Sequence, residues 1–305
     1  MKLIQLRALC SVVDMGSFRS AARQLNSAQS TLTDSIQSLE RELGVTLLVR
    51  SSQGISLTQA GKVFLTRARS IILDCDRAVQ DVRHCNGMHE GQIAMGVSAQ
   101  ALAACLMPVF SSFTGRFPNV QLHVASGGTK MLIEMIRAGR LDFVMCPLNP
   151  DVGDIDLHIE RLYHTKTSII ARKGHPLADA RSLHDLVDCQ WVSVRPAGVI
   201  GSAEKHLIEL FRAQGLPPPS IAITGESLLE ILHMVCETDY LTIEPGMLAS
   251  MKLFSSTLVS LSIREPLESC EVSLVSRRVS PMSQVTQELT SMLISYSRLR
   301  HRAKG

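Results

Sequence analysis

Residues 17–61 decide the fold at the start of the chain, and they read SFRSAARQLNSAQSTLTDSIQSLERELGVTLLVRSSQGISLTQAG. Ser17 is a typical N-cap, so we expect a short helix over residues 18–25, followed by a tight turn at Asn26 and Ser27. The apolar residues that come next recur at i, i+4, i+7 and i+11, as on one face of a second, longer helix. They are Leu32, Ile36, Leu39 and Leu43.

The second helix is expected to stop at Gly44, because glycine readily adopts the left-handed conformation that ends helices. Two short apolar runs, 45–48 and 55–57, then flank a turn that contains Gly54, and this pattern predicts a small β-hairpin. A short helix, a tight turn, a longer helix and a hairpin together make a winged helix-turn-helix. We assign residues 1–60 to this domain.

A winged helix-turn-helix predicts binding to double-stranded DNA, because the second helix can lie in the major groove with its first residues facing base edges. Gln29 can contact adenine at two atoms, Thr33 offers a hydroxyl and a methyl group, and Arg50 in the wing can neutralise a phosphate. The candidate DNA contacts are Ser17, Arg19, Ala28, Gln29, Ser30, Thr31, Thr33, Asp34, Gln37 and Arg50. The pattern alone leaves open a small helical domain that contacts protein instead.

Basic charge is concentrated at the start of the chain. Residues 1–85 hold eleven Lys or Arg and seven Asp or Glu, a net charge of +4, whereas the remainder holds twenty and twenty-one. A basic first third fits a surface for nucleic acid, although a slightly basic surface without a partner would have the same composition.

A long helix is expected over about residues 58–85, and we assign residues 61–87 as a linker. Its apolar seam consists of Phe64, Ala68, Ile71, Cys75, Ala78 and Val82. A lone helix of this length has nothing of its own to cover such a seam, so we expect it to pack against a second copy of the chain. Packing within the same chain is the alternative.

Residues 91–305 follow a hinge-like loop at 86–91 and alternate between candidate strands and helices, which predicts an α/β domain with mostly parallel sheets. The candidate strands are 93–97, 120–125, 143–146, 167–171, 191–194, 221–224, 240–243, 258–263 and 272–275. Helices are expected at 130–140, 202–214, 227–237 and 283–299.

Other functional classes find little support in the sequence. The eight cysteines contain no CxxC pair and the histidines show no HxH or HExxH spacing, so we expect neither a metal nor a cofactor. GxSxG and phosphate-loop motifs are absent, which argues against an enzyme. There is no secretory signal and no apolar stretch of about 20 residues, so we expect a cytoplasmic protein rather than a membrane protein or an extracytoplasmic solute receptor.

The first 61 residues closely resemble the LysR-type transcriptional regulators. The matching residues are Gly16-Ser17-Phe18, Ala21-Ala22, Leu25, Gln29, Leu32-Thr33, Ile36-Gln37-Ser38-Leu39-Glu40, Leu43-Gly44, Leu47-Leu48-Val49-Arg50, Leu57-Thr58 and Ala60-Gly61. The resemblance implies that the second helix and the wing bind DNA, and that the linker helix joins the chains into a homo-oligomer, either a dimer or a tetramer. The length, linker helix and α/β region of the remaining chain fit the same family.

Three positions depart from the usual pattern of this family. Ser30 stands where proline is usual, Thr31 where alanine is usual, and Asp34 where a basic residue is usual. Asp34 would repel a phosphate, or it could accept a hydrogen bond from a cytosine amino group. The operator sequence is therefore left open.

The resemblance also implies a C-terminal effector domain with two subdomains like those of periplasmic binding proteins, and a small ligand in the cleft between them. Subdomain I is expected over residues 91–162 and 266–305 and subdomain II over 163–265, with chain crossings near 162–163 and 265–266. The fold class is then α+β and α/β combined: a winged helix-turn-helix, a long linker helix and a two-subdomain α/β domain.

Strand ends and helix starts in this domain suit an anion, because backbone N–H groups and hydroxyls gather there and ligands of open α/β sheets lie beyond the carboxyl ends of the strands. The candidate effector contacts are Ser98, Ala99, Gln100, Gly128, Thr129, Cys146, Pro147, Ser202, Glu226 and Ser227. Arg195 is a further candidate counter-charge or a surface arginine. The serines could also serve only as N-caps.

We therefore predict a regulator whose promoter activity is controlled by a small organic acid, with the nearest resemblance to family members that respond to aromatic acids. A redox-sensing regulator is the alternative, since some LysR-type proteins switch by forming a disulfide. Cys189 has no cysteine within forty residues on either side, so the sequence suggests no local disulfide loop there.

Overall fold

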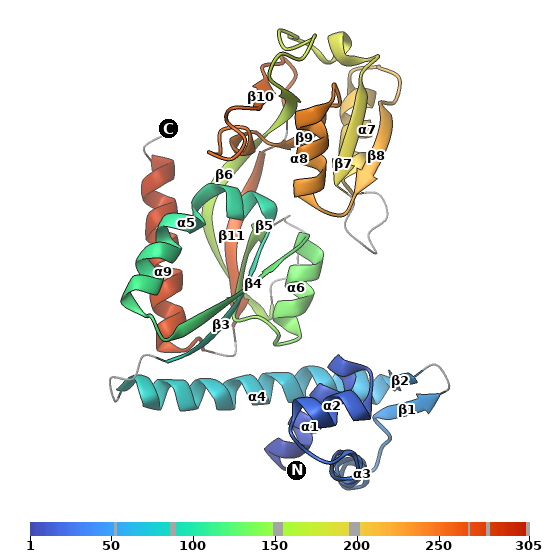
Figure 1. The fold of residues 1–305 in the computed structure, drawn as a ribbon, viewed down its shortest axis with the longest axis vertical. Coiled ribbons are helices and arrows are strands. Elements are labelled where there is room, and N and C mark those ends of the chain that lie inside the picture. The colour runs from blue at the N-terminus through green and yellow to red at the C-terminus, as the bar shows by residue number, and fades with distance from the viewer. Residues whose placement is uncertain are drawn as a thin grey trace.

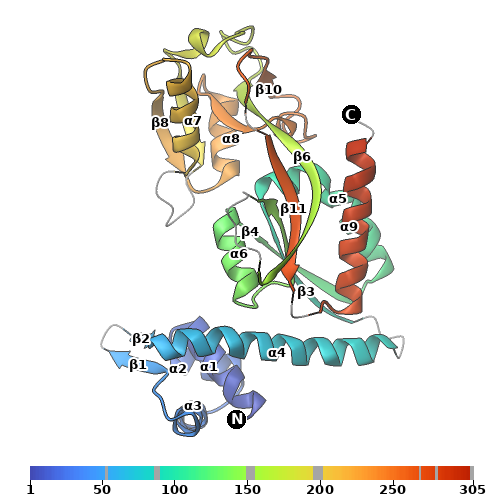
Figure 2. The same cartoon turned by 180° about the vertical axis from the view of Figure 1, so that it is seen from behind.

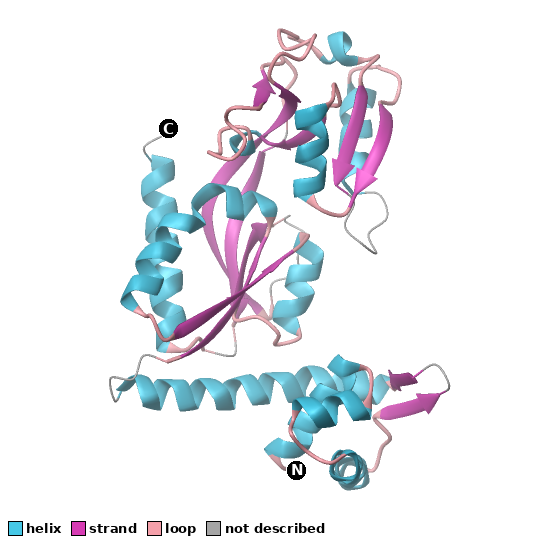
Figure 3. Ribbon diagram, viewed as in Figure 1, coloured by secondary structure: helices cyan, strands magenta, loops and turns pink. Residues whose placement is uncertain are grey.

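The computed structural model describes residues 1–51, 54–85, 90–148, 155–194, 202–267, 269–278 and 281–302. A helical N-terminal domain lies at one end, one long helix runs beside it, and a two-lobed α/β part lies on the other side of that helix (Figure 1). We name the half of the α/β part next to the long helix lobe I and the distal half lobe II. Figure 2 shows this arrangement from behind, and Figure 3 distinguishes the helices from the strands.

The N-terminal domain contains α1 (Leu3–Met15), α2 (Phe18–Gln24), α3 (Gln29–Leu43), β1 (Leu48–Ser51) and β2 (Gly54–Leu57). Its helices pack around buried apolar residues that include Leu9 and Leu39. Ser17 caps α2, because its Oγ accepts a hydrogen bond of 3.3 Å from the N–H of Ser20. Gly44 ends α3 with a φ of 68°. The helix boundaries predicted from Ser17 and Gly44 are confirmed.

The long helix α4 (Gln59–Cys85) has 27 residues and so extends for about 40 Å. It begins directly after the hairpin, where Gly61 lies so close to the carbonyl oxygen of Leu47 that a Cβ would come within 2.1 Å of it. Leu65 and Ala68 are buried in the core of the N-terminal domain. One end of α4 is therefore anchored on that domain.

Lobe I is built on parallel strands with helices on both faces. Its elements are β3 (Gly91–Val97), α5 (Ala99–Arg116), β4 (Val120–Ser126), α6 (Thr129–Arg137), β5 (Phe143–Pro147), the first half of β6 (Leu157–Arg172), β11 (Ser269–Arg277) and α9 (Gln284–Arg302). β3 lies between β4 and β5 and is parallel to both. Phe113 of α5 and Leu289 of α9 pack in one core, and Leu132 of α6 packs in another.

Lobe II contains two parallel strands and two strands that pair with β6. Its elements are η1 (Leu183–Leu186), β7 (Gln190–Val194), α7 (Ser202–Ala213), β8 (Ser220–Gly225), α8 (Leu228–Glu237), β9 (Thr242–Pro245), η2 (Gly246–Leu248) and β10 (Leu258–Leu261). Trp191 is fully buried and meets Phe211 edge to face, with ring centroids 5.7 Å apart.

Two long strands, β6 and β11, connect the lobes. Within the described residues the central sheet has the order β10-β6-β11-β5-β3-β4, and β9 pairs with β6. The expectation of mostly parallel sheets is thus only partly right. The sheet is mixed because the chain leaves lobe I along β6 and returns along β11, which must run in the opposite direction. The candidate strand 167–171 is the second half of β6.

The pairing directions show which edges of the two lobes face each other. β5 and β6 run the same way because both are antiparallel to β11, so the carboxyl ends of the lobe I strands point toward lobe II. β9 is antiparallel to β6, so its carboxyl end points back toward lobe I. β7 and β8 run parallel to β9 through the bridge between Trp191 and Leu241. We call these opposed strand ends the facing edges.

Candidate nucleic-acid interface and effector site

The first turns of α3 carry the predicted base contacts on an exposed face. α3 turns Leu32, Ile36 and Leu39 toward the core. The opposite face exposes Ala28, Gln29, Ser30, Thr31, Asp34 and Gln37, and Thr33 is half-buried. α3 lies on the side of the domain away from the lobes (Figures 1 and 2), so neither lobe covers this face.

Two arginines of α2 add positive charge to this end of the molecule. Arg19 and Arg23 are exposed, and neither pairs with a carboxylate among the described residues. By contrast, Arg7 is committed to an ion pair with Asp76 at 2.5 Å. Arg19 and Arg23 are therefore available to neutralise phosphates.

The wing is a short antiparallel hairpin in which Arg50 lies opposite Ile55. The side chain of Arg50 and the whole of residues 52–53 lie outside the described residues. Glu40, near the end of α3, fixes the base of the wing. Its Oε1 accepts hydrogen bonds from the N–H groups of Leu47 and Leu48 at 2.7 and 3.0 Å.

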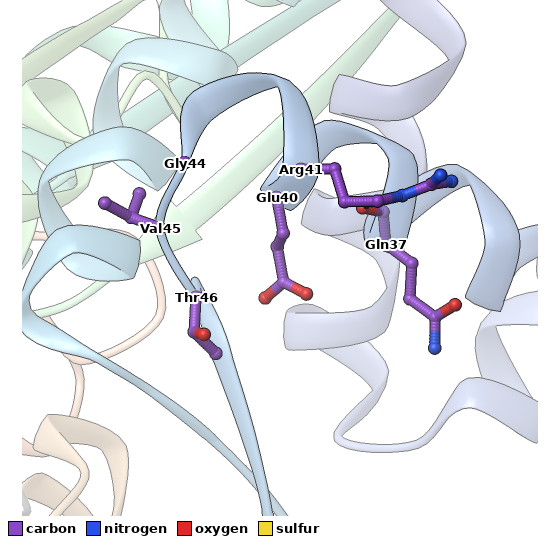
Figure 4. Close-up of a pocket in the computed structure, with 6 residues that line it drawn as sticks. All are labelled: Gln37, Glu40, Arg41, Gly44, Val45 and Thr46. Atoms are coloured by element: carbon purple, nitrogen blue, oxygen red, sulfur yellow. Dashed lines mark hydrogen bonds between the residues drawn. The ribbon is translucent and has the colours of Figure 1, made fainter.

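A surface hollow of about 400 Å³ lies at the C-terminal end of α3 (Figure 4). Gln37, Glu40, Arg41, Gly44, Val45 and Thr46 line it. The Glu40 carboxylate already accepts the two hydrogen bonds that hold the wing, and the Nε of Arg41 donates to the carbonyl of Gln37 at 3.4 Å. The polar groups of the hollow thus serve the local fold, and we assign it no ligand.

The predicted apolar seam of α4 has two parts. Phe64 and Ala68 pack on the N-terminal domain, as the alternative of packing within the chain expects. Further along the helix Ile71 is 39% exposed and Val82 is 64% exposed, and Cys75 and Ala78 are exposed as well. The described residues leave the C-terminal part of the seam uncovered.

Another face of α4 docks on lobe I through buried polar groups. The Nη2 of Arg77 lies 2.7 Å from the Oδ1 of Asp142, and both side chains are almost fully buried. The Oδ2 of Asp142 accepts a hydrogen bond of 2.8 Å from the N–H of Ala94. Asp81 accepts a hydrogen bond of 3.0 Å from the N–H of Gln284, where α9 begins. The linker helix and lobe I are therefore tied together.

The facing edge of lobe I brings two helix starts and one strand end together. Ser98 follows β3 and is the N-cap of α5, with its Oγ accepting from the N–H of Ala101 at 3.2 Å. Gly128 is the N-cap of α6. The Oγ1 of Thr129 donates to the carbonyl oxygen of Pro147 at 3.0 Å, which joins α6 to the end of β5. Four candidate effector contacts thus lie along one edge.

The cysteine and the two remaining candidates of lobe I are placed differently. Cys146 is fully buried in the core beneath α6, so its thiol does not lie at the surface of the edge. Ala99 and Gln100 lie in the first turn of α5, but their side chains lie outside the described residues.

Burial makes three of the described cysteines poor redox switches. It raises the pKa of the Cys146 thiol to about 12 and that of Cys10 to about 11, and it also raises the pKa of Cys189. A raised pKa leaves little of the reactive thiolate at neutral pH. These three thiols give no support to the redox-sensing alternative.

The facing edge of lobe II contains Glu226 and Ser227 between β8 and α8. Glu226 is exposed, and Ser227 has the backbone conformation of an N-cap without forming a cap hydrogen bond through its side chain. Ser202 is the first residue of α7, and its side chain lies outside the described residues. Arg195 lies wholly outside them.

Sequence reasoning missed Glu244, which lies near the end of β9. It is only 9% exposed, and burial raises the pKa of its carboxyl to about 8. The next element, η2, carries Met247 onto the core of lobe I. The only signal in the sequence is a single acidic residue within the otherwise apolar and uncharged run 241–248.

Two other kinds of site were sought in the described residues. No group of three His, Cys, Asp or Glu side chains there could hold a metal ion. None of the described helices combines the length and the apolar character that crossing a membrane requires.

An exposed helix-turn-helix with a wing, a long helix and a two-lobed α/β part together define a DNA-binding regulator that carries a ligand-binding domain. The chain belongs to the LysR family. Residues 3–62 match the bacterial regulatory helix-turn-helix protein, lysR family, and residues 86–298 match the LysR substrate binding domain. The protein is thus a LysR-type transcriptional regulator with an effector-binding domain, and it is not an enzyme.

Individual relatives agree with this assignment. The HTH-type transcriptional regulator TdcA of Escherichia coli K12 is 26% identical, with 95% of this chain and 93% of the relative covered. The regulator BenM of Acinetobacter baylyi is 27% identical, with 86% of each chain covered. Among solved structures, full-length CbnR bound to its target DNA shares the fold with a TM-score of 0.65 at 20% identity, covering 97% of this chain and 100% of CbnR.

Proposed function

We propose that this regulator controls promoter activity in response to a small organic acid bound between the facing edges of the two lobes. The observation that carries the proposal is the convergence of the starts of α5 and α6 at the edge of lobe I, beside the end of β5. Helix starts present N–H groups without intrahelical partners and the positive end of the helix dipole, and both favour a carboxylate.

The connection between the lobes supports a switch. β6 is continuous through the junction and β11 begins beside it, level with Lys166 of β6, so small changes at this level would move lobe II relative to lobe I, as in hinge closure. An acid that touches both edges favours one arrangement of the lobes over the other. A ligand shifts the equilibrium between two arrangements only if it binds one of them more tightly than the other.

For DNA we propose base contacts from Gln29 and Thr33, and phosphate contacts from Arg19 and Arg50. Exposure of Gln29 at the start of α3 and the unpaired state of Arg19 support these roles. We further propose that the protein acts as a homo-oligomer joined through the uncovered part of the α4 seam.

The test of the effector site compares two hydroxyls. An acid is first found by a thermal-shift screen, because a ligand of the folded state raises the melting temperature. Its affinity is then measured by calorimetry for wild type, Ser98→Ala and Thr129→Val. Ser98 accepts its cap hydrogen bond and keeps a proton to donate, so Ser98→Ala should weaken binding about ten-fold or more.

Thr129→Val should weaken binding less, because the Thr129 proton is already donated to Pro147. Ser182→Ala is the control for loss of a cap, since the Oγ of Ser182 accepts from the N–H of His184 at a helix start in lobe II and has already donated its proton to Glu265. If Ser98→Ala binds the acid as tightly as Ser182→Ala does, Ser98 is only a cap and the acid lies elsewhere.

A further inference from the structure

Glu244 is a buried carboxyl that the fold does not use. It is 9% exposed, and among the described residues it forms neither a hydrogen bond nor an ion pair. Its partner across the sheet is Ser168 of β6. Burying a carboxyl without a partner costs free energy, and an apolar side chain would avoid that cost. Such a residue calls for a ligand to explain it.

No neighbouring element supplies a counter-charge within the part of the chain that the structure describes. β7, β8 and η2 carry no acidic or basic residue within their bounds. The acidic and basic residues of α8 are Glu230, His233 and Glu237, and all three are exposed. On β6, Lys166 is exposed and Arg172 is paired with Asp239 at 2.6 Å. Burial is therefore the cause of the raised pKa of the Glu244 carboxyl. At a pKa of about 8 the carboxyl is mostly protonated at neutral pH.

The position of Glu244 places it at the facing edge of lobe II. It is the next-to-last residue of β9, whose carboxyl end points toward lobe I. The sheet neighbours and α8 cover it from the sides, so we infer that its remaining exposure lies at this strand end. Directly afterwards, Met247 of η2 contacts the core of lobe I.

Strand register gives the separation of the two edges. Pro147, at the end of β5, is level with Tyr163 of β6 through Val272 of β11. Glu244 is level with Ser168, five residues further along β6. At about 3.3 Å per residue the two levels lie roughly 16 Å apart. A small extended molecule and the side chains that hold it can fill that span together.

Both edges carry helix starts, but only the edge of lobe II adds a buried carboxyl without a partner among the described residues. The edge of lobe I offers hydrogen-bond donors at the starts of α5 and α6, which suit a carboxylate. The edge of lobe II offers the unpartnered carboxyl of Glu244, which suits a cation as soon as it ionises. A plain acid would leave the Glu244 carboxyl without a charged partner.

We propose that the effector is an amino acid, whose carboxylate is held at the edge of lobe I and whose ammonium group is held by Glu244 at the edge of lobe II. This inference rests on the proposed effector site between the lobes. On binding, the ammonium group makes Glu244 ionise, and its proton passes to the solvent. The ligand then joins both lobes through charged contacts, which a plain acid would not do.

Calorimetry on the full-length protein tests this proposal. The probes are the twenty protein amino acids, 4-aminobutanoate and 6-aminohexanoate, each paired with the acid of the same skeleton that lacks the amine. Titrations at pH 7 use two buffers with different ionisation enthalpies, so that the number of protons released can be obtained. We expect at least one amino acid to bind ten-fold or more tightly than its matched acid and to release close to one proton.

Two variants complete the test. Glu244→Gln keeps the size and the neutral state of the protonated carboxyl, and it should reduce the affinity for that amino acid ten-fold or more and abolish the proton release. Glu230→Gln, at an exposed acidic residue of α8, should change neither. Circular dichroism of both variants checks that they fold.

The outcomes separate this inference from the proposed function. If plain acids bind as tightly as their amino acids, and Glu244→Gln has no effect, the amino-acid assignment is overturned and the organic-acid site stands. If amino acids bind without proton release and without dependence on Glu244, the role of Glu244 is overturned. If neither class of probe binds, the amino-acid assignment is wrong, and the thermal-shift screen alone then decides whether the organic-acid site stands.

Discussion

Single side chains in this protein acquire their roles from the hydrogen bonds they have already made. Ser98 and Thr129 look equivalent in the sequence, since each hydroxyl follows a strand and begins a helix. In the structure Ser98 accepts a bond from Ala101, whereas Thr129 donates one to Pro147. A hydroxyl has only one proton, so Ser98 retains its donor and Thr129 does not. Only the structure reveals this difference.

The raised pKa of Glu244 predicts a pH dependence of stability. The ordinary pKa of glutamate in an unfolded chain is about 4.3, and burial raises that of Glu244 to about 8 in the folded chain. Between these values the folded state binds one more proton than the unfolded state, so stability falls as pH rises, by about 1.4 kcal/mol per pH unit. This contribution is complete below about pH 4 and is lost as pH rises through 8.

Glu244→Gln removes that loss, because the amide does not ionise. We expect the variant to gain stability over wild type between pH 5 and pH 8.5, by an amount on the order of a few kcal/mol. Urea unfolding at several pH values measures it, with Glu230→Gln as the control at an exposed site. If the free energy of unfolding depends on pH in the same way for wild type and for Glu244→Gln, the Glu244 carboxyl is not buried as described.

Gln29 carries a prediction about DNA specificity. It is exposed at the first position of α3, where a side chain can reach a base edge. Gln29→Ala should cost about 1–3 kcal/mol at one base position and relax the preference there, as measured by binding to an operator and its single-base variants. Gln121→Ala, on an exposed glutamine of β4 in lobe I, is the matched control.

The wing supplies a contrast within the same experiment. Arg50→Ala should weaken binding to every sequence alike and reduce the slope of log affinity against log salt by about one per subunit, because a phosphate contact carries no base information. If Gln29→Ala also weakens all sequences uniformly, α3 is not oriented with its first turn at the bases.

Elements could be predicted from the sequence where one residue marks a boundary or one period dominates. Ser17 and Gly44 gave the ends of α2 and α3 because caps act locally. The sequence marked only the start of α5, since residues 99–116 are mostly small or apolar and contain Pro108, and their apolar residues define no single face. The first half of β6 was missed because exposed residues such as His158 and His164 interrupt it.

The candidate site was predictable to a similar degree. Strand ends and helix starts follow from local patterns, so the edge of lobe I could be anticipated from Ser98, Gly128 and Thr129. The burial of Glu244 could not be anticipated. It depends on the pairing of Glu244 with Ser168, far away in the sequence, and on the contact of η2 with lobe I. A short sequence window contains neither contact.

The uncovered part of α4 predicts an oligomer interface. Ile71 lies on the same stripe as Cys75, Ala78 and Val82, and no other described segment of the chain covers them. Ile71→Asp would bury an unpaired charge in a helix-to-helix contact and should shift the protein toward the monomer in sedimentation experiments. Val63→Asp is the matched control, because Val63 is 62% exposed on the same helix but lies about 100° from Phe64 around its axis.

An unchanged oligomer in Ile71→Asp would assign the contact to another surface. Dissociation of Val63→Asp as well would show that any charge on α4 disturbs the helix. The informative result is therefore the difference between the two variants rather than the behaviour of either one alone.

At the scale of the whole molecule, α4 is in contact with both of its neighbours. Asp14, just before the end of α1, pairs with Arg69 of α4 and lies 3.5 Å from Arg140 of lobe I. Gly139 of lobe I adopts a φ of 68° and lies against the backbone of α4 at Ser70. A change in the position of lobe I would therefore act on the DNA-binding domain through these direct contacts with α4 and α1.

The pair between Arg77 and Asp142 is the most deeply buried contact between α4 and its neighbours that we describe, and it gives the last prediction. Burial, and next the nearby Arg77, lower the pKa of Arg277, whereas Asp74 and then Asp142 raise it, so Asp142 is the buried one of two carboxylates that offset these cations. Asp142→Ala removes this carboxylate from the surroundings of Arg77 and Arg277. It also removes the acceptor for the N–H of Ala94. Loss of one partner of a buried pair costs about 3–5 kcal/mol, so the midpoint of urea unfolding should fall sharply.

Asp156→Ala is the control, because Asp156 pairs with Arg137 at 3.0 Å where both side chains are largely exposed, and such pairs contribute about 1 kcal/mol or less. If α4 transmits the state of lobe I, Asp142→Ala should still bind its operator but should respond less to the effector than Asp156→Ala does, since coupling between two sites requires a connected element that both can bias. The response is measured as the change in operator affinity on adding effector. Equal responses and equal midpoints in the two variants would mean that the buried pair does not connect the lobes to the DNA-binding domain.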